Sequence, residues 1–227
     1  MAQFIQGEKG GKGGGGARTP VESPNSLRSA SFARIIDVIS EGEIEGLVDG
    51  HKSIYFDDTP LVNADGTYNF KDVAVEVRTG TIGQARLTNT DGVEATQTIS
   101  TALKYNQPVV RSILTAGTDM VRVGIAVGQL SKQNTENGDI TGASVQHLIE
   151  YRPSGGAWIT VKTDTITGKT MSGYERQVIF KLNGSAPWDV RVTRLTADSA
   201  SSALANASTW TTLTGVVTDK FRYPAKI

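Results

Sequence analysis

The sequence predicts a mainly β protein whose second half is a β-sandwich. Runs of alternating apolar and polar residues recur between residues 119 and 196, separated by turn signals. The clearest run is residues 149–161, where two alternating segments flank Pro153-Ser-Gly-Gly156, a pattern typical of a β-hairpin. Strands at this spacing are typical of a fibronectin or immunoglobulin-like sandwich. We therefore expect the sandwich at residues 119–198.

The same alternation predicts the other strands of this region. They are residues 120–127, 145–151, 176–182 and 188–195, with a polar loop at 128–142. Trp158 and Trp188 lie in these strands, where tryptophan is ordinarily part of the core. Residues 199–208 are rich in Ser and Ala and predict a linker or a weak helix, and a last strand follows at 210–217. We expect residues 199–227 to be a linker and a strand that return to the preceding domain and are truncated there.

The first 25 residues predict a flexible arm. Residues 7–16 hold 7 of the 25 glycines, and so glycine-rich a segment loses much backbone entropy on ordering. Phe4 and Ile5 form a small apolar anchor near its tip, which favours docking to a partner. The alternative is a frayed terminus without a function, because disorder concentrates at termini.

Residues 26–118 predict a separate β domain. Residues 32–39 fit either a helical stripe or a buried strand, and their β-branched content favours a strand. Residues 53–56 predict a short strand that enters a turn, and residues 73–77 predict a clearer one. Further strands are expected around 96–101 and 109–114.

The composition excludes several classes of function. With no cysteine, the chain has no disulfide, thiolate metal site or cysteine nucleophile. It has only two histidines, and 23 basic residues balance 23 acidic ones, so no global field draws it to nucleic acid or anionic lipid. No apolar run is long enough to span a bilayer, and no signal peptide is indicated, which favours synthesis in a cytoplasm. We expect no enzymatic activity, cofactor, metal or direct nucleic-acid binding.

The strongest charge bias lies between residues 37 and 58. Seven acidic residues stand there against one base, Lys52. Carboxylates at this density suit a divalent cation, an electrostatic interface or a solvated edge, and the ligand spacing of a calcium loop is missing. The candidate interface residues are therefore the two anchor residues and four acids: Phe4, Ile5, Glu41, Glu43, Glu45 and Asp49.

Two further features suggest sites but favour structural roles. Thr163-Asp-Thr-Ile-Thr-Gly-Lys-Thr170 ends like a phosphate-binding loop, but its first glycine is missing and no helix follows, so a turn is expected. His147 lies in a predicted strand and is expected to be a hydrogen-bonded core residue, whereas His51 is expected to be exposed in a turn.

A resemblance to a known family rests on a long stretch near the N-terminus. It comprises Ser26-Leu-Arg-Ser29, Ala33-Arg-Ile-Ile-Asp-Val-Ile-Ser-Glu-Gly-Glu-Ile-Glu-Gly-Leu-Val-Asp-Gly50 and Lys52-Ser-Ile-Tyr-Phe-Asp-Asp-Thr-Pro-Leu-Val-Asn-Ala-Asp-Gly-Thr-Tyr-Asn-Phe70. The Gly-rich arm followed by Arg18-Thr-Pro20 fits the same pattern. The chain resembles the N-terminal region of the phage host specificity protein J family, the tail tip attachment proteins of lambda-like siphophages.

The resemblance implies a virion component at the tail tip, made in the host cytoplasm. It implies a homotrimeric hub that closes the tail, whose N-terminal domains join the tail tube end and its distal ring. It further implies that 26–118 form a hub-type β domain into which the sandwich is inserted. Members are several-fold longer, and their receptor-binding parts lie near the C-terminus, so contact with the host receptor is expected only through downstream regions. No catalytic residue of the family maps onto this chain.

Two other classes of function compete with this interpretation. The three tryptophans and the hairpin also suit a secreted carbohydrate-binding sandwich, although a signal peptide is missing. A glycosidase would require two carboxylates, with Glu41, Glu43 and Glu45 as the candidates, about 5–9 Å apart across a cleft.

Overall fold

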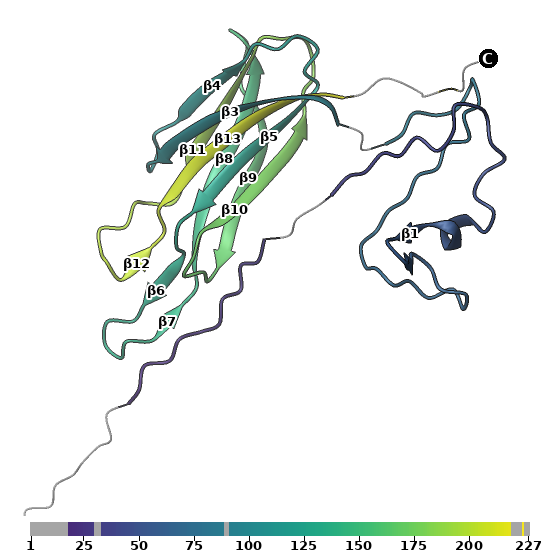
Figure 1. The fold of residues 1–227 in the computed structure, drawn as a ribbon. Helices are drawn as coiled ribbons and strands as arrows, with labels where there is room; N and C mark the ends of the chain where they lie inside the picture. The colour runs from purple at the N-terminus through teal and green to yellow at the C-terminus, as the bar shows by residue number, and fades with distance from the viewer. Residues whose placement is uncertain (1–17, 30–32, 89–90, 219–223, 225–227) are drawn as a thin grey trace, which may run out of the picture.

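The computed structural model describes residues 18–29, 33–88, 91–218 and 224. Two antiparallel sheets dominate it, one with the strand order β10-β5-β13-β3 and the other β4-β11-β8-β9 (Figure 1). In chain order these strands are β3 (Asp91–Leu103), β4 (Val109–Ile113), β5 (Met120–Val127), β8 (Ala143–Pro153), β9 (Ile159–Gly168), β10 (Tyr174–Lys181), β11 (Trp188–Arg194) and β13 (Ser208–Thr218). The predicted mainly β sandwich is confirmed.

Alternation along the strands places one apolar face of each sheet in a shared core. In β8, Val145, Ile149 and Tyr151 are buried, while Gln146 and Leu148 between them are more exposed. Trp188 of β11 and Trp210 of β13 are both 0% exposed and are the largest side chains of this core. Burial of apolar surface between the two layers is the main stabilising term of the sandwich.

Short elements complete the described chain. β12 (Leu204–Ala205), β6 (Ser131–Gln133) and β7 (Ile140–Thr141) form a small sheet at one end of the sandwich (Figure 1). Before β3 lie the 3₁₀ helix η1 (Gly50–Ser53) and the hairpin of β1 (Tyr55–Phe56) and β2 (Thr59–Pro60). No helix in the described ranges is long and apolar enough to cross a membrane.

The predicted strands of the sandwich are confirmed. The hairpin around Pro153-Ser-Gly-Gly156 joins β8 to β9, with Tyr151 opposite Ile159. The turn forms because the N–H of Gly156 donates to the carbonyl of Pro153 at 2.8 Å and Gly155 adopts a positive φ of 80°. The predictions for 120–127, 176–182 and 188–195 correspond to β5, β10 and β11.

The predicted limits of the sandwich, 119–198, are wrong at both ends. β3 and β4, assigned to the preceding domain, pair with β13 and β11 of the sandwich. The strand at 208–218 does not return to another domain, because it lies between β3 and β5 in the sandwich sheet. These strands were predicted, but their partners lie far away in the sequence, more than 100 residues apart for β3 and β13, which local alternation cannot reveal.

Two strands predicted in the N-terminal region are absent. Residues 33–39 are extended, but no strand pairs with them in the described part of the chain. Residues 73–77 likewise carry no ladder. A strand needs a hydrogen-bonded neighbour, so β-branched content alone did not decide the outcome.

The predicted flexible arm of residues 1–25 is corrected in its described part. Residues 18–27, which we call the strap, lie along the sandwich, and Glu22 forms a parallel bridge with Ile140 of β7. Phe4, Ile5 and the glycine run lie outside the described residues.

Candidate interface

The four acids of the candidate interface are all exposed. Glu41, Glu43, Glu45 and Asp49 lie in the segment that precedes η1. No described cavity is lined by them, and among the described residues no three His, Asp or Glu side chains are placed to hold a metal ion. These carboxylates therefore form an open, negatively charged surface rather than a cleft.

An exposed apolar segment precedes these acids. Ile35, Ile36, Val38 and Ile39 are 71%, 51%, 81% and 66% exposed, respectively. Scattered single apolar residues are normal on a surface, but four within five positions of unpaired backbone make a contiguous exposed apolar surface, which is typical of an interaction site. We call residues 35–39 the apolar segment.

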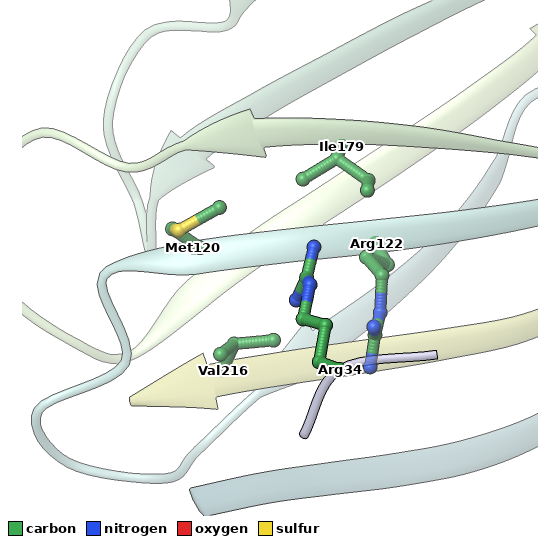
Figure 2. A pocket seen from close by; sticks show the side chains of 5 residues that line it. All are labelled: Arg34, Met120, Arg122, Ile179 and Val216. Atoms are coloured by element: carbon green, nitrogen blue, oxygen red, sulfur yellow. The ribbon is translucent and has the colours of Figure 1, made fainter. Parts of the chain in front are cut away.

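Arg34, directly before the apolar segment, packs on the sandwich. Figure 2 shows Arg34 lying over β5 and β13, beside Met120, Val216 and Ile179. Val216 points to the outer face of its sheet, opposite Met120 in the ladder, yet it is only 1% exposed. Arg34 therefore covers part of this outer sheet face, just before the apolar segment begins.

The unit at residues 44–88 has a small core. Leu61 and Val62 are buried, and Phe56 packs edge-on against Phe70 with ring centroids 5.0 Å apart. Val48 and Ile82 remain 97% and 65% exposed. A unit with so few buried apolar groups gains little stabilisation from its own packing.

The outer face of the second sheet carries a charged network around Trp158. Arg152 and Arg191 place their guanidinium carbons 4.4 and 4.2 Å from the Trp158 ring centroid. Arg152 donates to Asp189 at 3.0 Å, and Arg191 donates to Glu150 at 2.7 Å. Trp158 was predicted to be core, but it is only partly buried, because it lies just before β9, beneath the two arginines of this outer face. With Trp188 and Trp210 buried and Trp158 beneath two arginines, the tryptophans form no open stacking surface for a sugar.

His147 is the buried hydrogen-bonded histidine that was predicted. It is 0% exposed, and its Nε2 lies 2.9 Å from the Ser208 hydroxyl, which joins β8 to β13 across the core. Its Nδ1 has no partner among the described residues. Burial, reinforced by the nearby charge of Arg194, lowers the pKa of His147 from 6.5 to about 4. His51 is exposed, as predicted.

Acid is therefore expected to destabilise the sandwich through His147. In the unfolded chain the imidazole protonates near pH 6.5, whereas in the folded chain it stays neutral down to about pH 4. The contribution of the neutral imidazole to the free energy of unfolding is fully present above pH 6.5 and is lost as the pH falls from 6.5 to about 4. The total loss is about 3 kcal/mol. Urea unfolding between pH 7 and 4 measures this loss. His147→Gln keeps a donor toward Ser208 and should show a shallower slope, and equal slopes for the two proteins would refute the assignment.

An open hollow of about 350 Å³ lies near the small sheet, above the buried Arg194. It is lined by Ala102, Leu103, Lys104, Gly128, Gln129, Arg194, Asp198, Ser199, Ser201, Leu204, Ala205, Asn206, Ala207 and Ser208. The Arg194 donors already meet the carbonyls of Thr196 and Ala197 and the Asn206 side chain. Arg194 therefore has a structural role at the base of the hollow, because its hydrogen-bond donors are already used within the chain.

The segment that resembled a phosphate-binding loop has another role. Residues 163–168 belong to β9, not to the predicted turn, and Lys169 follows directly. The Lys169 side chain is 3% exposed, and its Nζ donates to Glu22 of the strap at 2.5 Å. Sequence reasoning missed this contact, because the two residues are 147 positions apart; the only local signal was the extended conformation favoured by Pro20 and Pro24.

Comparison with known families identifies the sandwich. Residues 93–219 match the family profile described as the FNIII-A domain of tip attachment protein J. The match covers more than half of the chain and follows the observed sandwich from β3 to β13. The chain belongs to the tip attachment protein J family.

Two curated members of the tip attachment protein J family match nearly the whole chain. The protein of Escherichia phage SECphi4 is 36% identical over 226 residues, 97% of this chain and 19% of the relative. The protein of Escherichia phage SECphi27 is 31% identical over 229 residues, 99% of this chain and 19% of the relative. The chain therefore spans about a fifth of the length of these relatives.

Solved structures show only distant likeness. A family GH115 4-O-methyl-α-glucuronidase is 10% identical, with 65% of this chain and 20% of that chain covered and a TM-score of 0.30. The CBM22-1 xylan-binding domain of Paenibacillus barcinonensis Xyn10C is 9% identical, with 60% and 91% covered and a TM-score of 0.30. At these values neither bears on the function of this chain.

Proposed function

We propose that this chain is a structural component of the phage tail tip: the N-terminal portion of a homotrimeric hub that joins the tail tube end and its distal ring to downstream receptor-binding parts. Membership of the tip attachment protein J family supports a place in the tail tip of the virion. The chain has no enzymatic role in this proposal, and contact with a host receptor falls to downstream regions.

The geometry that supports a hub role best is the way the chain enters and leaves the sandwich. Asp91, at the start of β3, and Thr218, at the end of β13, are opposite partners in one antiparallel ladder. Opposite residues of such a ladder lie about 5 Å apart. A domain inserted into another domain needs its first and last residues to lie close together, because the surrounding domain is then interrupted at a single place.

The segment before β3 gives a physical reason for partners. The apolar segment lacks a strand neighbour among the described residues, and the unit at 44–88 buries few apolar groups. We infer that both complete their packing against other hub segments, in the same chain or in neighbouring copies. The exposed acids Glu41, Glu43, Glu45 and Asp49 then act in partner choice, since charges mainly set specificity and association rate.

Removing the sandwich tests this proposal. In a phage that carries this chain, replacing residues 92–217 by a short Gly-Ser linker should leave tail assembly intact, because the linker spans ladder neighbours. Tails counted by electron microscopy measure the outcome. A matched variant with Ile36→Asp and Val38→Asp in the apolar segment should abolish tails. Loss of tails without the sandwich, or normal tails with the double variant, would overturn the proposal.

A further inference from the structure

We propose that the end of the sandwich formed by β7 and the turn after β9 is a peptide-recognition site, whose ligand is the chain's own strap, residues 18–27. The site is distinct from the hub contacts proposed above. It rests on contacts within this chain alone, so it stands or falls independently of the tail-tip role.

Backbone hydrogen bonds hold the strap in a fixed register at two points. At β7, Ile140 donates its N–H to the carbonyl of Val21 and accepts from the N–H of Ser23, both at 2.9 Å. At the turn after β9, the carbonyl of Lys169 accepts from the N–H groups of Ser26 and Leu27 at 2.9 and 3.2 Å. Such main-chain pairing is the usual means by which a sheet edge binds an extended peptide.

A buried lysine forms hydrogen bonds with side chains of the strap. Lys169 is 2% exposed, and its Nζ donates to the Glu22 carboxylate at 2.5 Å and to the Asn25 amide oxygen at 3.2 Å. The Ser26 hydroxyl accepts from the Lys169 N–H at 2.9 Å. A buried ammonium without its carboxylate is costly, so the site favours a peptide with an acid at this position.

Two glycines let the strap approach closely. A Cβ on Gly168 would lie 2.7 Å from the Ser26 hydroxyl and 2.9 Å from Leu27, and a Cβ on Gly138 would lie 2.9 Å from the Pro20 ring. Both glycines also have a positive φ, 151° and 79°, which other residues rarely adopt. The surface is thus shaped to this segment and not merely covered by it.

Contacts at the two ends complete the recognition. Arg18 donates to Asp139 at 2.7 Å, and the N–H of Val21 donates to the same carboxylate at 2.8 Å. The Val21 N–H and then the Arg18 guanidinium hold the pKa of Asp139 below its usual value. At the other end Leu27 packs against the apolar core.

The sandwich does not need the strap for its own core. All buried members of the core cluster lie between Leu103 and Leu213, and Leu27 is only a partly buried addition to it. The strap therefore behaves as a ligand supplied in cis, which ties the N-terminal arm to the β6-β7 end of the sandwich.

Peptide binding to the full chain with a disabled strap tests this inference. In this chain Glu22→Ala and Leu27→Asp remove the charge pair and the apolar contact. A fluorescent peptide of residues 18–27 should bind this variant at least about tenfold more tightly than it binds the unsubstituted chain. In the unsubstituted chain the site is already occupied by the chain's own strap, which competes at a high effective concentration. Fluorescence anisotropy measures binding, and near-UV circular dichroism of the buried tryptophans checks the fold.

A charge swap makes the test specific. A peptide carrying Glu22→Lys should not bind the disabled chain, and adding Lys169→Glu to that chain should restore its binding. Failure of the unsubstituted peptide to bind a folded disabled chain, or equal binding of both peptides, would overturn the inference.

Hydrogen exchange on the unsubstituted chain gives an independent test that needs no variant. The amides of Ser23, Ser26 and Leu27 should be protected and should exchange together through an opening that leaves β5 and β13 protected. Exchange at unprotected rates, or only with the whole sandwich, would contradict a separable bound strap.

Discussion

Replacing Trp188 by alanine is expected to lower the free energy of unfolding by about 3–5 kcal/mol. The indole is 0% exposed, packs edge-on against Tyr151 with ring centroids 5.9 Å apart, and lies so close to Gly184 that a Cβ there would be 2.9 Å from the ring. Neighbours this tightly packed cannot collapse into the space that alanine leaves. Denaturant unfolding followed by circular dichroism measures the loss.

Phenylalanine provides the matched control at the two buried tryptophans. The Trp188 Nε1 has no hydrogen-bond partner among the described residues, whereas the Trp210 Nε1 donates to the Thr212 carbonyl at 2.8 Å. Trp188→Phe should therefore cost less than Trp210→Phe, because only the second breaks a hydrogen bond. An unchanged unfolding curve for Trp188→Ala would show that this residue is not in the core.

Replacing Arg194 by methionine is expected to lower the free energy of unfolding by about 3–5 kcal/mol, because several hydrogen bonds from a buried charged group are lost together. The residue is 2% exposed and donates to the carbonyls of Thr196 and Ala197 at 2.8 and 3.1 Å and to the Asn206 amide oxygen at 2.9 Å. Methionine fills similar volume but leaves the Thr196 carbonyl and the Asn206 amide oxygen without this donor, whereas the Ala197 carbonyl keeps a hydrogen bond from the Asn206 Nδ2 at 3.3 Å. Arg194→Lys should recover little, because an ammonium cannot reach the same set of acceptors.

The control for Arg194→Met is a substitution at the neighbouring carboxylate of Asp198. Asp198 lies 3.5 Å from Nη1, and its side chain is 42% exposed. An exposed ion pair at this distance contributes at most about 1 kcal/mol, so Asp198→Asn should have a small effect on unfolding. If Asp198→Asn cost as much as Arg194→Met, the ion pair, not the carbonyl contacts, would be the main role of Arg194.

Local signals predicted the local part of the fold. Pro153-Ser-Gly-Gly156 fixed the β8-β9 hairpin, and the alternation in residues 120–127 fixed β5. The limits of the sandwich were missed, because β3 is rich in threonine and finds its partner, β13, at the far end of the domain. Residues 33–39 have the composition of a strand, but a ladder also requires a neighbour.

The candidate interface was predicted only in part. The acids at 41–49 are exposed, as an interface or a solvated edge requires, and their role as contacts stays a prediction. The strap site could not be predicted, because the burial of Lys169 and its pairing with Glu22 arise only when residues 147 positions apart meet. A lysine between Gly168 and Thr170 gives no sign of this in the sequence.

The strap and the inserted sandwich suggest one arrangement. The chain enters and leaves the sandwich at neighbouring ladder positions, while the strap binds near the β6-β7 end. Under the proposed function, we expect a sandwich held in this way to project from the hub and to be tied to the N-terminal strap. We therefore expect that the sandwich can be removed without disturbing the tail.

The most direct measurement is electron microscopy of tails from particles that carry the whole chain, compared with tails in which a linker replaces residues 92–217. The proposed function predicts that both tails are complete and that density is lost only at the distal end, in three symmetric positions. Density lost elsewhere on the particle, or no difference between the two tails, would contradict the assignment of this chain to the tail-tip hub.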